Sequence, residues 1–228
     1  MFLVVAGIHL AACSGCASPT REYYLKKGDS LVAGGDCESA LAEFKHALQA
    51  GKPDHWIYQR IADVQVRLGR TSEAIGSLLD AARLIEKDGE ETSRRARDTA
   101  DESERKTLLH LLEDRIVPYQ SQVYLKVALL YISSGDHAKA VTALEQALNW
   151  VESNLRARFE LARLMDRKGD RRGAFEQWRR VLKDFEKASK EDLALYAIGD
   201  DELALARKRF EELALTRAGG QEGQEGTR

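Results

Sequence analysis

The sequence predicts an all-α fold in which pairs of helices repeat along the chain. The composition favours helices over sheets, because 228 residues include only 3 prolines and 7% aromatic residues, with 32% charged residues. Apolar residues recur at helical spacing over most of the length. One pattern, a glycine followed by alanine five residues later and a bulky apolar residue four further on, occurs four times: GDCESALAEF, GRTSEAIGSL, GDHAKAVTAL and GDRRGAFEQW.

The alanines of this pattern mark one repeated unit. They are Ala40, Ala74, Ala140 and Ala174, and their spacings are 34, 66 and 34 residues. A helical-period stretch precedes each glycine and another follows it, which predicts helix, glycine turn and helix. The small alanine predicts a close crossing of the two helices, because a larger side chain there would overpack the contact.

This repeated pattern resembles the tetratricopeptide repeat, a 34-residue helix pair with alanine and a bulky residue four apart in its second helix. Those pairs here are Ala40/Phe44, Ala74/Leu78, Ala140/Leu144 and Ala174/Trp178. The resemblance implies a solenoid of helical hairpins wound into a right-handed superhelix. The four units are placed at 21–54, 55–88, 121–154 and 155–188.

Between the first pair of units (21–88) and the second pair (121–188) lies an irregular segment, 89–120. From Lys87 to Lys106, thirteen of twenty residues are charged, and a helical stripe of leucines follows. The segment is interpreted as a degenerate helix pair or, alternatively, as a mobile charged loop leading into one helix. Residues 189–215 are expected to form capping helices, and 216–228 a disordered tail.

The chain opens with MFLVVAGIHLAACSGC. The apolar run is too short to span a bilayer but has the length of a signal-peptide core. Leu10-Ala11-Ala12-Cys13 resembles a bacterial lipobox, which implies a signal peptide at 1–12, a lipid on Cys13 and a linker at 13–20. Ser14 implies the outer membrane, with the protein facing the periplasm. The alternative is an ordinary apolar helix on a cytosolic protein.

Catalysis is not expected. The sequence lacks the P-loop, dinucleotide-binding, nucleophile-elbow and zinc-protease motifs, and its 5 histidines are scattered. We therefore predict no enzyme activity, cofactor, metal or small-molecule substrate. A net charge of −2 gives no reason to expect nucleic acid as a ligand.

A binding groove is expected instead. In the resembling family the first helix of each unit lines a concave surface, which implies a protein or peptide partner. The matching positions here are Trp56, Gln59, Arg60, Asp63, Leu125, Leu129, Phe159 and Arg163. The arginines favour a partner with some acidic character. Alternatively, Leu125, Leu129 and Phe159 pack between neighbouring units.

The expected function is a protein–protein interaction scaffold. The two resemblances together imply a lipid-anchored envelope protein that supports assembly of a larger complex, such as pilus, secretion or outer-membrane machinery. The alternative is a soluble cytosolic adaptor or regulatory module.

Overall fold

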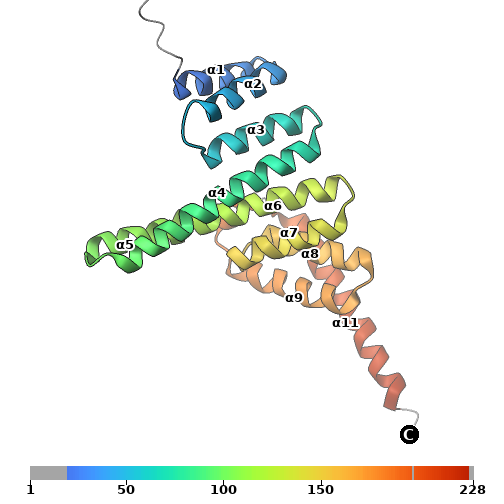
Figure 1. The fold of residues 1–228 in the computed structure, drawn as a ribbon. Helices are drawn as coiled ribbons and strands as arrows, with labels where there is room; N and C mark the ends of the chain where they lie inside the picture. Colours follow the sequence, from blue (N-terminus) through green and yellow to red (C-terminus); the bar gives the residue numbers. More distant parts are fainter. Residues whose placement is uncertain (1–19, 197, 226–228) are drawn as a thin grey trace, which may run out of the picture. The chain divides into compact units, whose positions relative to one another are not determined.

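The structure is a computed structural model that describes residues 20–196 and 198–225, and within these ranges the secondary structure is entirely helical. Figure 1 shows the helices in order. They are α1 (Arg21–Ala33), α2 (Cys37–Gln49), α3 (His55–Arg67), α4 (Thr71–Asp98), α5 (Glu102–Leu111), the π-helical turn η1 (Leu112–Ile116), α6 (Val117–Ser133), α7 (His137–Trp150), α8 (Leu155–Lys168), α9 (Arg171–Lys187), α10 (Lys190–Leu195) and α11 (Asp200–Glu225).

Contacts divide the chain into two compact units, residues 1–52 and 53–228. In the first unit, α1 and α2 form one hairpin whose turn contains Gly35 at φ 83°, a conformation that glycine adopts without strain. The two helices cross closely, since a Cβ atom on Gly28 would lie 2.5 Å from the ring of Phe44. Ala40 and Ala47 of α2 are fully buried as well. The predicted hairpin of unit one is therefore present.

The second unit contains three further hairpins, α3–α4, α6–α7 and α8–α9, stacked side by side. Each turn has its glycine in the left-handed region: Gly69 at φ 71°, Gly135 at φ 81° and Gly169 at φ 82°. The alanines of the repeat are 0% exposed at all four positions. Their burial confirms the sequence-based explanation, in which the small side chain lets two helices approach.

Two apolar clusters form the core of residues 53–228. The first joins the α3–α4 and α6–α7 hairpins and reaches α8 through Ala157, Leu161 and Leu164. The second joins α8 and α9 to α11 and includes the fully buried Trp178. Each helix packs on its partner within the hairpin, and neighbouring hairpins meet through α4 on α6 and α7 on α8, which is the arrangement of a repeat protein.

Segment 89–120 is helical and lengthens its neighbours. Helix α4 continues for 28 residues through the charged stretch to Asp98, and α5, η1 and α6 run consecutively from Glu102 to Ser133. The far half of α4 and α5 pair as a hairpin that projects from the stacked helices (Figure 1). The mobile-loop alternative is therefore wrong. The extra residues elongate the second helix of unit two and the first helix of unit three.

The C-terminal segment covers the end of the stack. Ala206 and Leu213 of α11 are buried against α8 and α9, as a capping helix requires. Arg209 of α11 also pairs with Asp166 of α8 through two hydrogen bonds of 2.6 Å. Helix α11 extends to Glu225, whereas the composition predicts disorder from residue 216. A docked helix extends more easily than an isolated one nucleates, which accounts for the difference.

The predicted signal peptide, the predicted lipid acceptor Cys13 and most of the predicted linker lie in residues 1–19, outside the described residues. In the part of the chain that the structure describes, no helix combines the length and apolar character needed to cross a bilayer.

Candidate protein-docking site

The expected groove residues fall on α3, α6 and α8, and the structure separates them by exposure. Trp56, Arg60, Asp63 and Leu129 are exposed, with half of the Trp56 side chain accessible. Asp63 of α3 lies 3.7 Å from the amine of Lys126 on α6, so an ion pair joins the two helices.

The remaining groove residues are turned inward. Gln59 is buried, and Leu125 is half-buried against the first apolar cluster. Phe159 is 2% exposed and its ring meets the indole of Trp178 edge-on at 5.3 Å. The alternative interpretation, packing within the helix stack, therefore describes Leu125 and Phe159, and Phe159 offers no surface to a ligand.

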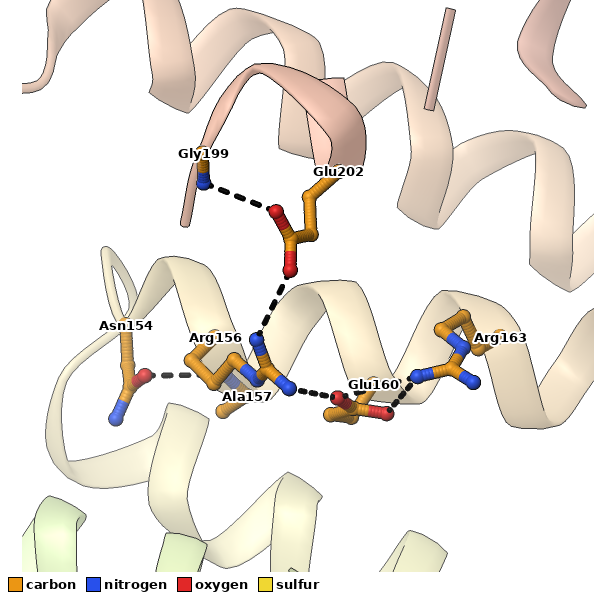
Figure 2. Close-up of polar contacts among 7 residues, drawn as sticks. All are labelled: Asn154, Arg156, Ala157, Glu160, Arg163, Gly199 and Glu202. Carbon is orange, nitrogen blue, oxygen red and sulfur yellow. Dashed lines mark hydrogen bonds and ion pairs between the residues drawn. The ribbon is translucent and has the colours of Figure 1, made fainter. Parts of the chain in front are cut away.

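Two arginines of α8, Arg156 and Arg163, are paired within the chain. Figure 2 shows the buried carboxylate of Glu160 between Arg156 at 2.8 Å and Arg163 at 3.1 Å. Arg156 also approaches Glu202 of α11 at 3.7 Å. Because their charges are balanced by neighbouring carboxylates, Arg156 and Arg163 give no specific support to the expected acidic partner.

A pocket opens at the base of the projecting hairpin, between α3, α4 and the η1–α6 junction. We call it the α3/α4/α6 pocket, and its volume is about 480 Å³. Ligand pockets in proteins span roughly 300–1,000 Å³, so this one has room for one or two large side chains. Its lining residues are His55, Trp56, Ile85, Asp88, Thr92, Leu111, Asp114, Arg115, Ile116, Pro118, Tyr119 and Gln122.

Three rings from α3 and α6 form an aromatic cluster on one wall of the pocket. The ring centre of Trp56 lies 4.5 Å from that of Tyr119 and 5.1 Å from that of His55. The rings of His55 and Tyr119 are 5.2 Å apart. Asp54 caps α3 by accepting a hydrogen bond of 3.0 Å from the Trp56 amide, which holds the first turn in place. Trp56 is thus held against two other rings while about half of its surface stays exposed.

The π-turn η1 contributes a further part of the pocket lining. Pro118 has no backbone N–H, so it cannot donate to the carbonyl of Asp114 as a regular α-helix would require. The chain widens to a π-turn at that point, and Asp114, Arg115 and Ile116 line the pocket. On α4, Gly89 leaves room for this turn, because a Cβ atom there would lie 3.2 Å from Ile116 Cγ2.

The pocket carries charged groups over an apolar base. Asp88 and Asp114 contribute carboxylates, and Arg115 contributes a guanidinium. Burial lowers the pKa of His55, although Asp54 and Asp88 act in the opposite direction, so the imidazole is neutral at pH 7. Burial also raises the pKa of Tyr119, whose phenol therefore stays protonated. With Asp88, Asp114 and Arg115 ionised, the residues that line the pocket carry a net charge of −1.

Sequence reasoning found Trp56 but missed the rest of this pocket. Tyr119, Asp114 and Arg115 lie in the segment interpreted as a degenerate repeat, and Asp88 lies in its charged run. The proline at 118 was the available signal, because a proline inside a helical pattern marks a distortion. Within the described residues, no three His, Cys, Asp or Glu side chains gather as a metal site would require.

Comparisons with known proteins agree with this fold. A family profile described as tetratricopeptide repeat matches residues 121–154, the range assigned to unit three from the sequence. The crystal structure of MamA matches with a TM-score of 0.52 and 20% identity, over 73% of this chain and 79% of MamA.

Two other crystal structures match less closely. YrrB, described as a tetratricopeptide protein with an unusual peptide-binding site, gives a TM-score of 0.48 at 15% identity, covering 86% of this chain and 91% of YrrB. A thermophilic tetratricopeptide protein of Thermus thermophilus, TTC0263, gives 0.31 at 22% identity, covering 81% of this chain and 100% of that one. A search of curated proteins found no match. The chain therefore has an all-α, tetratricopeptide-like fold, in which residues 121–154 match the repeat itself.

Proposed function

We propose that this chain is a non-enzymatic protein–protein interaction scaffold that docks a segment of a partner protein in the α3/α4/α6 pocket. The observation that carries the proposal is Trp56, an ordered tryptophan with 51% of its surface exposed at the edge of an apolar pocket. Tryptophan and tyrosine are the side chains most enriched among residues that dominate binding energy at protein interfaces.

The pocket fits an apolar anchor side chain from a peptide or helix. Ile85, Leu111 and Ile116 supply an aliphatic base, and the aromatic cluster supplies a flat wall. An anchor buried there would bring about 1.5–3 kcal/mol from removal of its apolar surface from water. Polar groups around the base would orient the segment, as is common in ligand sites.

A peptide-display experiment tests the docking function. A library of random 12-residue peptides is selected on the purified chain, and retention of the enriched peptides is compared with Trp56→Ala. We expect that variant to lose at least tenfold in affinity, because about 1.4 kcal/mol corresponds to tenfold. Far-UV circular dichroism should be unchanged, since the Trp56 side chain is half exposed.

Tyr23→Ala is the matched control, because Tyr23 is an aromatic residue of nearly equal exposure, 50%, in the first unit. It should retain wild-type affinity. Equal binding by the wild type and Trp56→Ala would place the interaction surface elsewhere and end this proposal.

We also propose that the scaffold is a lipid-anchored envelope protein of the outer membrane, facing the periplasm and supporting a pilus, secretion or outer-membrane assembly. The support is the lipobox-like Leu10-Ala11-Ala12-Cys13 after an apolar run. Two or more acyl chains on one cysteine would anchor firmly, because each buried CH₂ contributes about 0.8 kcal/mol.

Metabolic labelling tests the anchor. The full chain is expressed in a Gram-negative host with radiolabelled palmitate, and the wild type should incorporate label and fractionate with the outer membrane. Cys13→Ala should do neither, while Cys16→Ala, which keeps the lipobox, should label normally. An unlabelled wild type in the soluble fraction would favour the cytosolic adaptor instead.

A further inference from the structure

We propose that the docked segment carries a basic side chain next to its apolar anchor, and that Asp88 and Asp114 receive this cation at the α3/α4/α6 pocket. The inference rests on the docking function proposed above and names the chemistry of its partner. It replaces the acidic partner that the arginine-rich first helices suggested from sequence.

The first reason to expect a basic partner is the carboxylate of Asp88. Its carboxylate lines the pocket from α4, and within the described residues it forms no hydrogen bond or ion pair. The side chain influences the pKa of His55, but burial keeps that imidazole neutral, so His55 does not balance the charge at pH 7. Asp88 is exposed, so a cation of a docked segment could reach its carboxylate directly.

Asp114 adds a second carboxylate from a different element. It lies on the π-turn and, among the described residues, pairs only with His110, one helical turn earlier, on an exposed surface where such pairs contribute little. A Lys or Arg side chain entering between α4 and η1 would therefore meet carboxylates from both. Because the pair with His110 is weak, Asp114 can pair instead with a Lys or Arg side chain of the docked segment.

The aromatic cluster also favours a positive charge on the docked segment. The Trp56 indole is half exposed, and the face of an indole attracts ammonium and guanidinium groups by about 0.5–1 kcal/mol at exposed sites. The same ring offers its apolar surface to the neighbouring anchor. A segment with an apolar and a basic residue close together satisfies both features of the pocket.

Arg115 adds a positive charge to the pocket lining, which would repel a basic segment. It would favour an acidic segment, but such a segment would also face both carboxylates and the indole. The paired arginines of α8 offer no compensating attraction, since Glu160 already lies between Arg156 and Arg163. The balance of charge therefore selects a basic segment.

The peptide pool selected on the full chain provides the test. We expect enriched sequences to contain Lys or Arg within a few positions of an apolar residue. For the consensus peptide, labelled and measured by fluorescence anisotropy, Asp88→Asn should raise Kd about threefold, as expected for an exposed ion pair, and Arg115→Ala should lower it. The affinity should also fall as salt rises from about 50 to about 500 mM.

Two further variants test whether the effect of Asp88→Asn comes from the charge at that position. Glu91→Gln removes an exposed carboxylate from α4 on a surface that does not line the pocket, and it should leave Kd unchanged. Asp88→Lys should reject the basic consensus peptide and enrich acidic peptides in a new selection.

A pool that depends on Trp56 but is acidic or uncharged would overturn this inference and leave the docking function intact. The same holds if Asp88→Asn binds the consensus peptide like the wild type. A pool that does not depend on Trp56 would overturn both proposals.

Discussion

At the scale of single residues, Asn154 joins two repeat units. It is fully buried, its side-chain oxygen caps α8 by accepting from the Ala157 amide at 3.0 Å, and its amide donates to Ser121 Oγ of α6 at 2.8 Å. Ser121 in turn donates to the carbonyl of Ala147 on α7 at 2.8 Å. One side chain thereby satisfies polar groups of α6 and α8 that have no access to water.

Replacement of Asn154 by alanine should therefore destabilise the chain. We expect Asn154→Ala to lower the free energy of unfolding by about 2 kcal/mol, because a cap and a buried hydrogen bond are lost together. Urea titration followed by circular dichroism measures the change. Asp136→Ala, which removes the cap of α7 but no bond between units, should cost only about 1 kcal/mol. Equal losses would show that the Ser121 contact contributes nothing.

At the scale of elements, α11 is attached to α8 by the Asp166–Arg209 pair. The guanidinium holds the pKa of Asp166 below its usual value of 3.8. A carboxyl group with a lowered pKa in the folded state stabilises that state above its unfolded pKa. This contribution is lost as the pH falls from about 3.8 through the folded-state value.

Asp166→Asn should remove this dependence on pH. At pH 7 the variant should be less stable than the wild type, whereas at pH 3 the difference should be smaller, because the stabilisation linked to the lowered pKa of Asp166 begins to be lost below the unfolded-state value of 3.8. Urea midpoints at the two pH values measure the effect. Asp184→Asn is a useful comparison, since Asp184 pairs with the buried Arg158 on the α8–α9 hairpin itself. A difference for Asp166→Asn that does not vary with pH would contradict the assignment.

At the scale of the whole molecule, the core of residues 53–228 consists of linked local clusters. Helices of one hairpin contact the adjacent hairpins, so a defect should propagate only to neighbours. Trp178 belongs to the second cluster, is 1% exposed and is the largest fully buried side chain among the described residues.

Trp178→Ala should cost about 3–5 kcal/mol of local stability, as large core truncations do. Hydrogen exchange measured by mass spectrometry should then accelerate in α8, α9 and α11, with α3 and α4 unchanged. Leu78→Ala, in the first cluster, should give the reverse pattern on α3 and α4. Uniform acceleration over α3–α11 would show one cooperative unit instead.

Much of the fold could be predicted from particular residues. Gly69, Gly135 and Gly169 mark turns because only glycine enters the left-handed region freely, and Ala74, Ala140 and Ala174 mark crossings because only a small side chain fits. The candidate site was predictable only in part. Trp56 follows a visible helix start, but Asp88 and Asp114 sit in a charged run where nothing in the pattern distinguishes them from solvated residues.

The sequence by itself determined the helices, their glycine turns and the hairpin unit, because these depend on interactions over a few residues and on a period that recurs. Only the tertiary structure decided that segment 89–120 would lengthen α4 and α6, that Phe159 would be buried, and that His55, Asp88 and Tyr119 would meet at one pocket. Those outcomes depend on which helix faces pack together, and that choice is made by contacts between residues far apart in the chain.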